Sequence, residues 1–345
     1  MTRATLRDVA ERAGVSIRTV SNVVNGYAAV SGAMRARVEV ALAELDYRPN
    51  LVARNLKQGR TGLIALAVPE LDVPYFAELA RAVITSARQR GFAVMIEQTD
   101  GEPDRELELL DRGSRTALFD GLLFSPIAVT AEQLRDRSNQ VPLVLLGEHL
   151  AAPSYHHVAI DNVAAAREAT EHLIALGRRR IAAIGDQPYD TGETAQLRTA
   201  GYRQALRRAG LEYDERLVVP TERFHRRLGA QAMTQLLALP EPPDAVFCYN
   251  DLLALGAIHA LHRAGVRIPE DVAVVGFDDI EEGQFSTPTL STIAPDKIRI
   301  AELAVDRLLD AIAGRPAGLC STTAPYRLTR RESTTPAQPA PQAVG

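Results

Sequence analysis

The spacing of hydrophobic positions changes once along this chain, close to residue 61. Before that point, apolar residues recur three or four positions apart, as they do on one face of a helix. After it, short apolar runs alternate with amphipathic stretches. The first pattern predicts a small all-helical head. The second predicts an α/β core of parallel strands joined by right-handed helical crossovers.

The first helix of the head is predicted to begin at Thr5. Thr5 can act as its N-cap, and Asp8 lies three residues later, as in a capping box. Gly14 can adopt the left-handed conformation that ends a helix, and Ser16 can cap the next one. The apolar face of the first helix is formed by Leu6, Val9, Ala10 and Ala13.

The second helix has one apolar and one polar side. Val20 and Val23 point in one direction, toward the expected core. At about 100° per residue, the opposite arc carries Ile17, Arg18, Ser21, Asn22 and Asn25. A polar face on the second of two short helices is typical of a helix-turn-helix DNA reader. The alternative is an ordinary helical hairpin with a solvated side.

A third helix and a short fourth one are predicted next. Ser31 can cap the third helix, which completes a bundle with apolar positions at Val38, Ala41, Leu42 and Leu45. The fourth follows Pro49 and is only about two turns long, a length that is marginal in water. Because Arg54, Lys57 and Arg60 flank its apolar residues, we expect it to fold on a partner, with DNA as the candidate.

The charge distribution agrees with a DNA-binding head. The whole chain has a net charge of −4, but residues 1–60 carry +5 and the remainder carries −9. A basic head gains affinity by releasing counterions from phosphates, whereas an acidic body discourages nonspecific contact between the core and DNA.

At this point the chain resembles the lactose/galactose repressor (LacI/GalR) family. The resemblance rests on LRDVAERAGVS followed by TVS and VVNG within residues 6–26, on VS at 30–31, and on YRPN with AR and L within 47–56. It extends through most of the core, in AIDN at 159–162, RTAGY at 198–202, YND at 249–251, VVGFDD at 274–279 and TLSTI at 289–293.

For DNA binding, the resemblance implies that the second helix lies in the major groove and that residues 50–58 form a hinge helix in the minor groove. Ile17, Arg18 and Asn22 would then select the sequence, and Leu56 would be the wedge that kinks the central base step. Ile17 departs from the polar or aromatic residue often found there, although it can contact a thymine methyl group. The remaining expected DNA contacts are Thr5, Leu6, Ser16, Thr19, Ser21, Asn25, Ser31, Asn50, Ala53 and Arg54.

In the core, two series of strands and helices predict two doubly wound subdomains. The family resemblance adds that this core is similar to the one these regulators share with periplasmic sugar-binding proteins. Ligands of such sheets bind beyond the carboxyl ends of the strands. The polar and aromatic residues found there, together with those implied by the resemblance, give the expected effector site: Asp72, Tyr75, Phe76, Ser125, Glu148, Asp161, Thr194, Arg198, Phe224, Asn250 and Asp278.

Polar residues that follow the strands also have a purely structural interpretation. An Asp or Asn after a strand is usually the N-cap of the next helix, and this interpretation is favoured for Asp161, Asn162 and Asp251. Asp278 fits it less well, because the residues after GFDD do not open a clean helix. Its carboxylate is therefore expected to accept hydrogen bonds from a ligand.

The resemblance implies that Arg198, Asn250 and Asp278 contact the effector and that Phe224 stacks on it. A carboxylate can accept from neighbouring hydroxyl groups, and an aromatic ring suits the C–H side of a sugar, so a saccharide is favoured. Tyr75 and Phe76 leave a purine-like co-repressor open, because adjacent aromatic residues could sandwich a base. No cofactor is expected.

Two other classes of protein are disfavoured by the sequence. An enzyme would show a phosphate-binding loop, a GxSxG elbow or metal-ligand spacing, none of which is found. The pairs His156–His157 and His259–His262 are expected on the surface rather than on a metal, and Cys248 and Cys320 form no motif. A sugar-binding transport protein would need export and would not need residues 1–60. The sequence shows no signal peptide, so a cytoplasmic protein is expected.

The expected organisation is a head at 1–48, a hinge at 49–60, an effector-binding and dimerisation core at 61–332 and a disordered tail at 333–345. Reading a palindromic operator takes two heads related by a two-fold axis, so a homodimer is expected. The tail is rich in proline and lacks leucine, which argues against a tetramer. We expect the effector to shift the two subdomains and thereby the pairing of the hinge helices.

Overall fold

A computed structural model describes residues 4–24, 30–47, 60–111, 118–148, 155–188, 191–315 and 321–335. The chain divides into two compact units, Met1–Gly62 and Leu63–Gly345. The hinge helix expected within residues 50–58 lies outside the described residues.

The first unit contains three packed helices, α1 (Leu6–Ala13), α2 (Ile17–Val24) and α3 (Gly32–Glu44). The predicted caps are confirmed. The Thr5 hydroxyl accepts from the Asp8 amide, while the Thr5 amide donates to the Asp8 carboxylate at 2.7 Å. Ser31 caps α3 by accepting from the Met34 amide. The buried faces of the three helices meet in a core of Val9, Ala10, Ala13, Val20, Val23, Val38 and Ala41.

The turn between α1 and α2 depends on Gly14 and on a residue from α3. Gly14 has φ = 62°, in the left-handed region that a glycine adopts without strain. Arg37 reaches back from α3, and its Nη2 donates to the carbonyl of Ala13 at 2.5 Å. The guanidinium thus satisfies a carbonyl that the end of α1 leaves unpaired.

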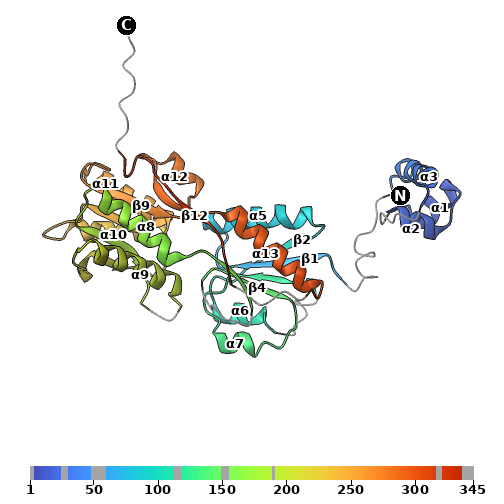
Figure 1. Cartoon of the computed structure of the whole chain (residues 1–345), viewed down its shortest axis with the longest axis horizontal. Helices are drawn as coiled ribbons and strands as arrows, with labels where there is room; N and C mark the ends of the chain where they lie inside the picture. The colour runs from blue at the N-terminus through green and yellow to red at the C-terminus, as the bar shows by residue number, and fades with distance from the viewer. Residues whose placement is uncertain are drawn as a thin grey trace, which may run out of the picture. The chain divides into compact units, whose positions relative to one another are not determined.

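The second unit is built on two six-stranded sheets, which Figure 1 shows side by side. All pairings are parallel in the first sheet, and the β10–β12 pair is the antiparallel one in the second. The order in the first sheet is β11 (Ser321–Thr323), β5 (His156–Ala159), β4 (Leu143–Leu146), β3 (Leu122–Phe124), β1 (Leu63–Val68) and β2 (Ala93–Gln98). The order in the second sheet is β12 (Tyr326–Thr329), β10 (Ser291–Pro295), β9 (Ala273–Phe277), β8 (Ala245–Cys248), β6 (Ile181–Asp186) and β7 (Val218–Pro220).

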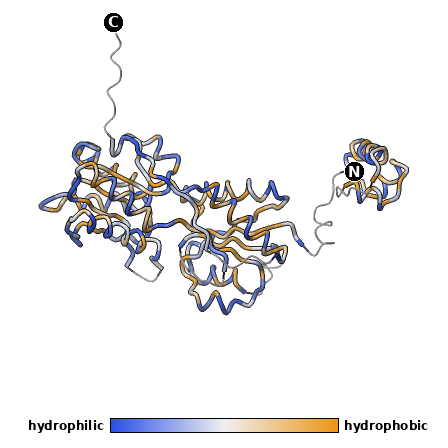
Figure 2. Tube along the Cα trace, viewed as in Figure 1, coloured by the Kyte–Doolittle hydropathy of each residue, from blue (hydrophilic) through white to orange (hydrophobic). Residues whose placement is uncertain are grey.

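The central strands are apolar on both faces because helices cover both faces. In β1, Ile64 packs with residues of α5 (Pro74–Gln89) and α13 (Lys297–Ile312), whereas Ala65 belongs to the cluster on the opposite face, with Leu134 of α7 (Ala131–Arg135). Figure 2 shows hydrophobic residues running along the inner segments of the second unit, which Figure 1 draws as strands. The second sheet is flanked by α8 (Asn162–Ala175) and α9 (Glu193–Arg208) and by α10 (Arg226–Leu237) and α11 (Asp251–Arg263). The remaining helices are α6 (Pro103–Glu108), the 3₁₀ segment Glu215–Leu217 and α12 (Glu281–Phe285).

The chain passes between the two sheets three times: from β5 to α8, from β10 to α13, and from β11 to β12. These passes define two lobes, each with one sheet. They also explain why α13 packs on the first sheet although it follows strands of the second. The hydrophobic pattern did not predict β5, β10, β11 or β12, which are only three to five residues long.

Two expectations about the core are wrong. Ser333 and Thr334, placed in the disordered tail, are buried, and the Ser333 amide and carbonyl bond Thr289 and Val274, both at 2.9 Å. The packed core therefore continues to at least residue 334. His156 and His157 are buried in β5 rather than exposed, although His259 and His262 do lie at the surface of α11. Among the described helices, none is long and apolar enough to cross a membrane.

Candidate functional site

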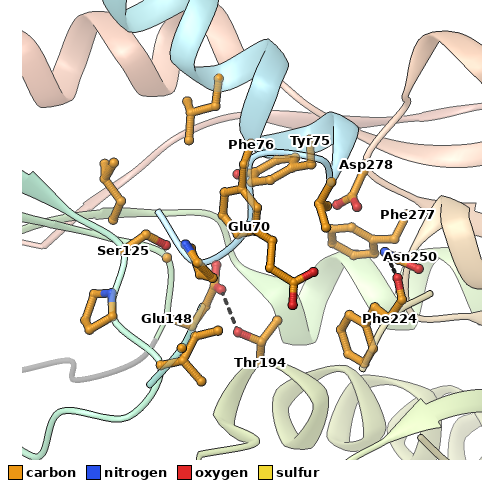
Figure 3. Close-up of a pocket in the computed structure, with 18 of the residues that line it drawn as sticks. Glu70, Tyr75, Phe76, Ser125, Glu148, Thr194, Phe224, Asn250, Phe277 and Asp278 are labelled. Carbon is orange, nitrogen blue, oxygen red and sulfur yellow. Dashed lines mark hydrogen bonds between the residues drawn. The ribbon is translucent and has the colours of Figure 1, made fainter. Parts of the chain in front are cut away.

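The second unit encloses a cavity of about 360 Å³ beyond the carboxyl ends of strands from both sheets. This is the position expected for a ligand site in parallel α/β sheets. Nine of the eleven residues expected in the effector site line it, and Figure 3 shows most of them converging on one space. The nine are Tyr75, Phe76, Ser125, Glu148, Thr194, Arg198, Phe224, Asn250 and Asp278.

The other two expected residues lie elsewhere. Asp72 is exposed and does not line the cavity. Asp161 caps α8 by accepting from the Ala164 amide at 2.9 Å, so the structural interpretation is confirmed for this residue. That interpretation is wrong for Asp251: the cap of α11 is Asn250, which accepts from the Leu253 amide at 2.8 Å while also lining the cavity.

Arg198 is a buried cation in the cavity wall. It projects from α9; its Nε donates to Asn162 Oδ1 at 2.8 Å, and Nη1 donates to the carbonyl of Tyr249. Its Cζ lies 3.6 Å from the centroid of the Phe277 ring. Burial lowers the pKa of Arg198, and the nearby carboxylates of Asp278 and Glu148 raise it. Asn162, expected as a cap, therefore serves to orient this guanidinium.

Asp278 follows β9 and faces the cavity beside Phe277 (Figure 3). Burial raises the pKa of its carboxyl to about 7, although Arg198 and Lys297 act in the opposite direction. Its φ is 116°, a conformation that side-chain-bearing residues rarely adopt. A strained, buried carboxyl in a cavity wall is typical of a functional position.

The aromatic residues are arranged differently from the expected base sandwich. Tyr75 and Phe76, in the first turn of α5, pack edge to face, with ring centroids 5.3 Å apart and an interplanar angle of 75°. This arrangement leaves no parallel slot between them for a purine. Phe224 lies in the loop before α10, on the second lobe.

Three polar contacts join the lobes at the edge of the cavity. The Thr194 hydroxyl donates to Glu148 Oε2 at 3.1 Å. Glu70, after β1, pairs with Arg223 and with His225, whose Nε2 lies 2.9 Å from Glu70 Oε2. Sequence reasoning missed Glu70, Arg223 and His225. They lie in loops, where no hydrophobic period indicates which side chains face inward.

Sequence reasoning also missed Phe277 and Gln187 as cavity residues. Phe277 ends an apolar run, and this pattern predicts only a buried strand residue. Its position directly before Asp278 was the available signal. No group of three or more His, Cys, Asp or Glu residues suited to a metal ion occurs in the described part of the chain.

In the first unit, the residues expected at DNA lie on and around α2. Ser16, Ile17 and Arg18 are exposed, and Ser16 Oγ caps the helix by accepting from the Thr19 amide at 3.1 Å. Thr5 and Ser31 are also exposed, whereas Leu6, Thr19, Ser21 and Asn22 are half-buried. The other expected DNA contacts, Asn25, Asn50, Ala53, Arg54 and Leu56, lie outside the described residues.

Comparison with known proteins assigns both parts of the chain. Residues 5–50 match "Bacterial regulatory proteins, lacI family", and residues 170–334 match "Periplasmic binding protein-like domain". The HTH-type transcriptional repressor CytR of Escherichia coli (strain K12) is 35% identical over 334 residues, which cover 96% of this chain and 97% of CytR. The chain belongs to the LacI family.

Solved structures of LacI-family regulators agree with this assignment. The transcriptional regulator CelR in complex with cellobiose is 34% identical, with a TM-score of 0.71 and coverage of 96% of this chain and 100% of CelR. The Lac repressor dimer bound to operator and the anti-inducer ONPF is 29% identical, with a TM-score of 0.81. The match covers 96% of this chain and 99% of the Lac repressor chain. This LacI-family chain is a DNA-binding transcriptional regulator with an α/β effector core.

Proposed function

We propose that this chain is a homodimeric repressor whose operator affinity is controlled by an unphosphorylated saccharide bound in the cavity of the core. The observation that carries the proposal is the placement of Arg198 and Asp278 in one cavity wall, next to aromatic rings. A hydroxyl group can donate to the carboxylate and accept from the guanidinium. The rings offer apolar faces for the C–H groups of a sugar.

The charge of the cavity favours an uncharged ligand. Glu148 and Asp278 face the same space as Arg198, so a phosphate group would meet carboxylates as well as the guanidinium. The other basic residues in the lining, Arg223 and His225, already pair with Glu70. The edge-to-face packing of Tyr75 and Phe76 argues against a purine. CelR, which resembles this chain over most of its length, is described with cellobiose.

For DNA recognition, we assign operator selection to Ile17, Arg18 and Asn22 on α2 and propose a hinge helix within residues 49–60. Two heads in a dimer would read a pseudo-palindrome. The Lac repressor is described as a dimer bound to operator, and this chain resembles it throughout. A regulator of this kind acts in the cytoplasm, where its DNA is, and needs no catalytic residue or cofactor.

The proposed mechanism is a shift between two arrangements of the lobes. Saccharide binding would stabilise one arrangement and change the spacing of the paired hinge helices, so that they either form and insert Leu56 or melt. Coupling free energies of this type are about 1–3 kcal/mol, which changes operator affinity by up to about 100-fold.

Two measurements test the function. Selection from a random duplex library with the full chain should yield a palindromic operator. Melting temperatures should then be measured with D-ribose, D-galactose, cellobiose, glucose 6-phosphate and adenine. At least one neutral sugar should raise the melting temperature and alter operator affinity. A response to adenine or to the phosphorylated sugar alone would contradict the proposed effector class.

The hinge has a separate test in Leu56→Ala. This change should weaken operator binding by about tenfold or more, because the apolar wedge that pays for kinking the DNA is lost. Affinity for the saccharide should stay within twofold of wild type. Equal operator affinity in the two proteins, measured by fluorescence anisotropy, would remove Leu56 from the DNA interface.

A further inference from the structure

Lys297, the first residue of α13, has three acceptors for its three ammonium hydrogens. Its Nζ donates to the carbonyl of Asp278 at 2.5 Å and to the carbonyl of Asp279 at 3.0 Å. It also lies 2.6 Å from Glu78 Oε2. The Lys297 side chain is only 13% exposed, so water competes weakly for these bonds.

The two carbonyls belong to a turn that needs such support. Asp278 and Asp279 both have positive φ, 116° and 51°, which costs free energy for residues with a side chain. Neighbouring groups fix the rest of the turn: Asp251 Oδ2 accepts from the Ile280 amide at 2.9 Å, and Arg331 Nη2 donates to Asp279 Oδ1 at 2.6 Å. Lys297 binds the two carbonyl groups of this turn.

The third acceptor connects this turn to the other lobe. Glu78 lies on α5, one helical turn after Tyr75, and its Oε1 also accepts from the Glu281 amide at 3.2 Å. The Lys297 ammonium lies 5.8 Å from the centroid of the Tyr75 ring. One cation therefore contacts the turn that presents Asp278 and the helix that presents Tyr75 and Phe76.

The residue type suits this geometry. Lys297 is one of two lysines in a sequence with 39 lysines and arginines, the other being Lys57. A compact ammonium directs three donors in a tetrahedral arrangement, whereas a guanidinium is a planar fork that matches a single carboxylate. Two carbonyls and one carboxylate around a point favour the ammonium.

We propose that Lys297 is a positioning residue of the cavity, which fixes the Asp278 turn and ties it through Glu78 to α5. The proposal rests on the assignment of Asp278 to the effector site. Through this connection, a ligand that moves Asp278 also moves the first turn of α5. Conversely, a movement of α5 displaces Asp278.

Hydrogen exchange of the ligand-free full chain tests the proposal, with Lys297→Met as the main variant. Amides in peptides covering 278–283 and 74–80 should exchange at least tenfold faster, while exchange in α9 and β6 stays unchanged. The matched control is Arg299→Met, which removes a charge from the same turn of α13 but affects an exposed pair with Glu302. It should leave both peptides as in wild type.

Two further variants separate charge from geometry. Lys297→Arg keeps the charge, so it should leave the titration of the Asp278 carboxyl, followed by ¹³C NMR, near the wild-type midpoint while exchange at 278–283 rises. Lys297→Met should raise that midpoint. Glu78→Gln should speed exchange at 74–80, and adding it to Lys297→Met should have no further effect, because the pair is already broken.

Wild-type exchange at 278–283 in Lys297→Met, or additive effects of Lys297→Met and Glu78→Gln, would overturn the proposal. If Lys297→Met fails to fold, Glu78→Gln alone tests the proposal. Wild-type exchange rates at 74–80 and at the Glu281 amide in Glu78→Gln would overturn it. None of these measurements uses a ligand. A saccharide screen that failed would therefore refute the proposed effector class without affecting this result.

Discussion

The guanidinium of Arg198 lies over the ring of Phe277, with 3.6 Å between Cζ and the ring centroid. Arg198 comes from α9 and Phe277 from the end of β9, so the contact fixes a helix-borne cation against the sheet. The ring stabilises the positive charge without supplying a hydrogen-bond acceptor. The hydrogens of Arg198 that Asn162 and Tyr249 do not use therefore remain available to a ligand.

Phe277→Leu should weaken saccharide binding by about tenfold, because a desolvated cation–π contact contributes about 2 kcal/mol or less and leucine keeps most of the packing. Isothermal titration with the sugar identified in the melting screen measures this loss. Operator affinity without sugar should match wild type. Unchanged sugar affinity would mean that the ring does not orient Arg198.

The raised pKa of Asp278 predicts a pH-dependent stability. Its carboxyl has a pKa of about 7 in the folded chain against an ordinary value of 3.8, so the folded state binds a proton that the unfolded state has released. The stabilising contribution is complete below about pH 4 and is lost as the pH rises toward 7, with an upper limit of about 4 kcal/mol. Asp278→Asn should therefore flatten the decrease in melting temperature between pH 5 and 8. A parallel decrease in both proteins would show that Asp278 does not titrate in this range.

Glu70→Gln should speed release of the sugar. Glu70 of the first lobe pairs with Arg223 and His225 of the second, at the edge of the cavity. Because these partners are partly exposed, the pairs contribute about 1 kcal/mol, which corresponds to a roughly fivefold faster dissociation in stopped-flow measurements. The control is Asp72→Asn, which removes a nearby acidic charge outside the cavity. An equal rate in both variants would exclude a role for Glu70 in retaining the ligand.

Arg37→Met should destabilise the head by about 1–2 kcal/mol, because the carbonyl of Ala13 loses its charged donor. Calorimetry of the full chain should show an earlier unfolding transition for the head and an unchanged transition for the core. Operator affinity should fall, since α2 follows this turn directly. Melting of Arg37→Met identical to that of wild type would contradict the role of Arg37.

The sequence predicted the parts of this structure that depend on local pattern. Thr5, Gly14 and Ser31 act at helix ends as expected, because capping depends on residues only a few positions apart. Strand ends likewise located Ser125, Asn250 and Asp278 at the cavity, since parallel strands deliver their carboxyl ends to one edge of a sheet.

What local pattern could not predict depends on contacts between distant segments. Arg37 caps a helix 24 positions earlier, and Lys297 binds carbonyls 18 and 19 positions away. Asp72 was wrongly placed in the effector site, because its position after β1 does not show which way the loop turns. The sequence also could not show that Tyr75 and Phe76 pack edge to face, because ring orientation depends on tertiary packing.

The threefold passage of the chain between the sheets also determines the order in which the core can form during synthesis. The strands of the first sheet, except β11, are complete once residue 159 has been made, yet α13 packs on that sheet only after residue 312. The sheet of the second lobe is incomplete until β12 has been synthesised. Neither lobe can finish folding while residues 160–295 are being synthesised. During that time the nascent core exposes the apolar surface of its strands. Its last few dozen residues are needed to complete both lobes.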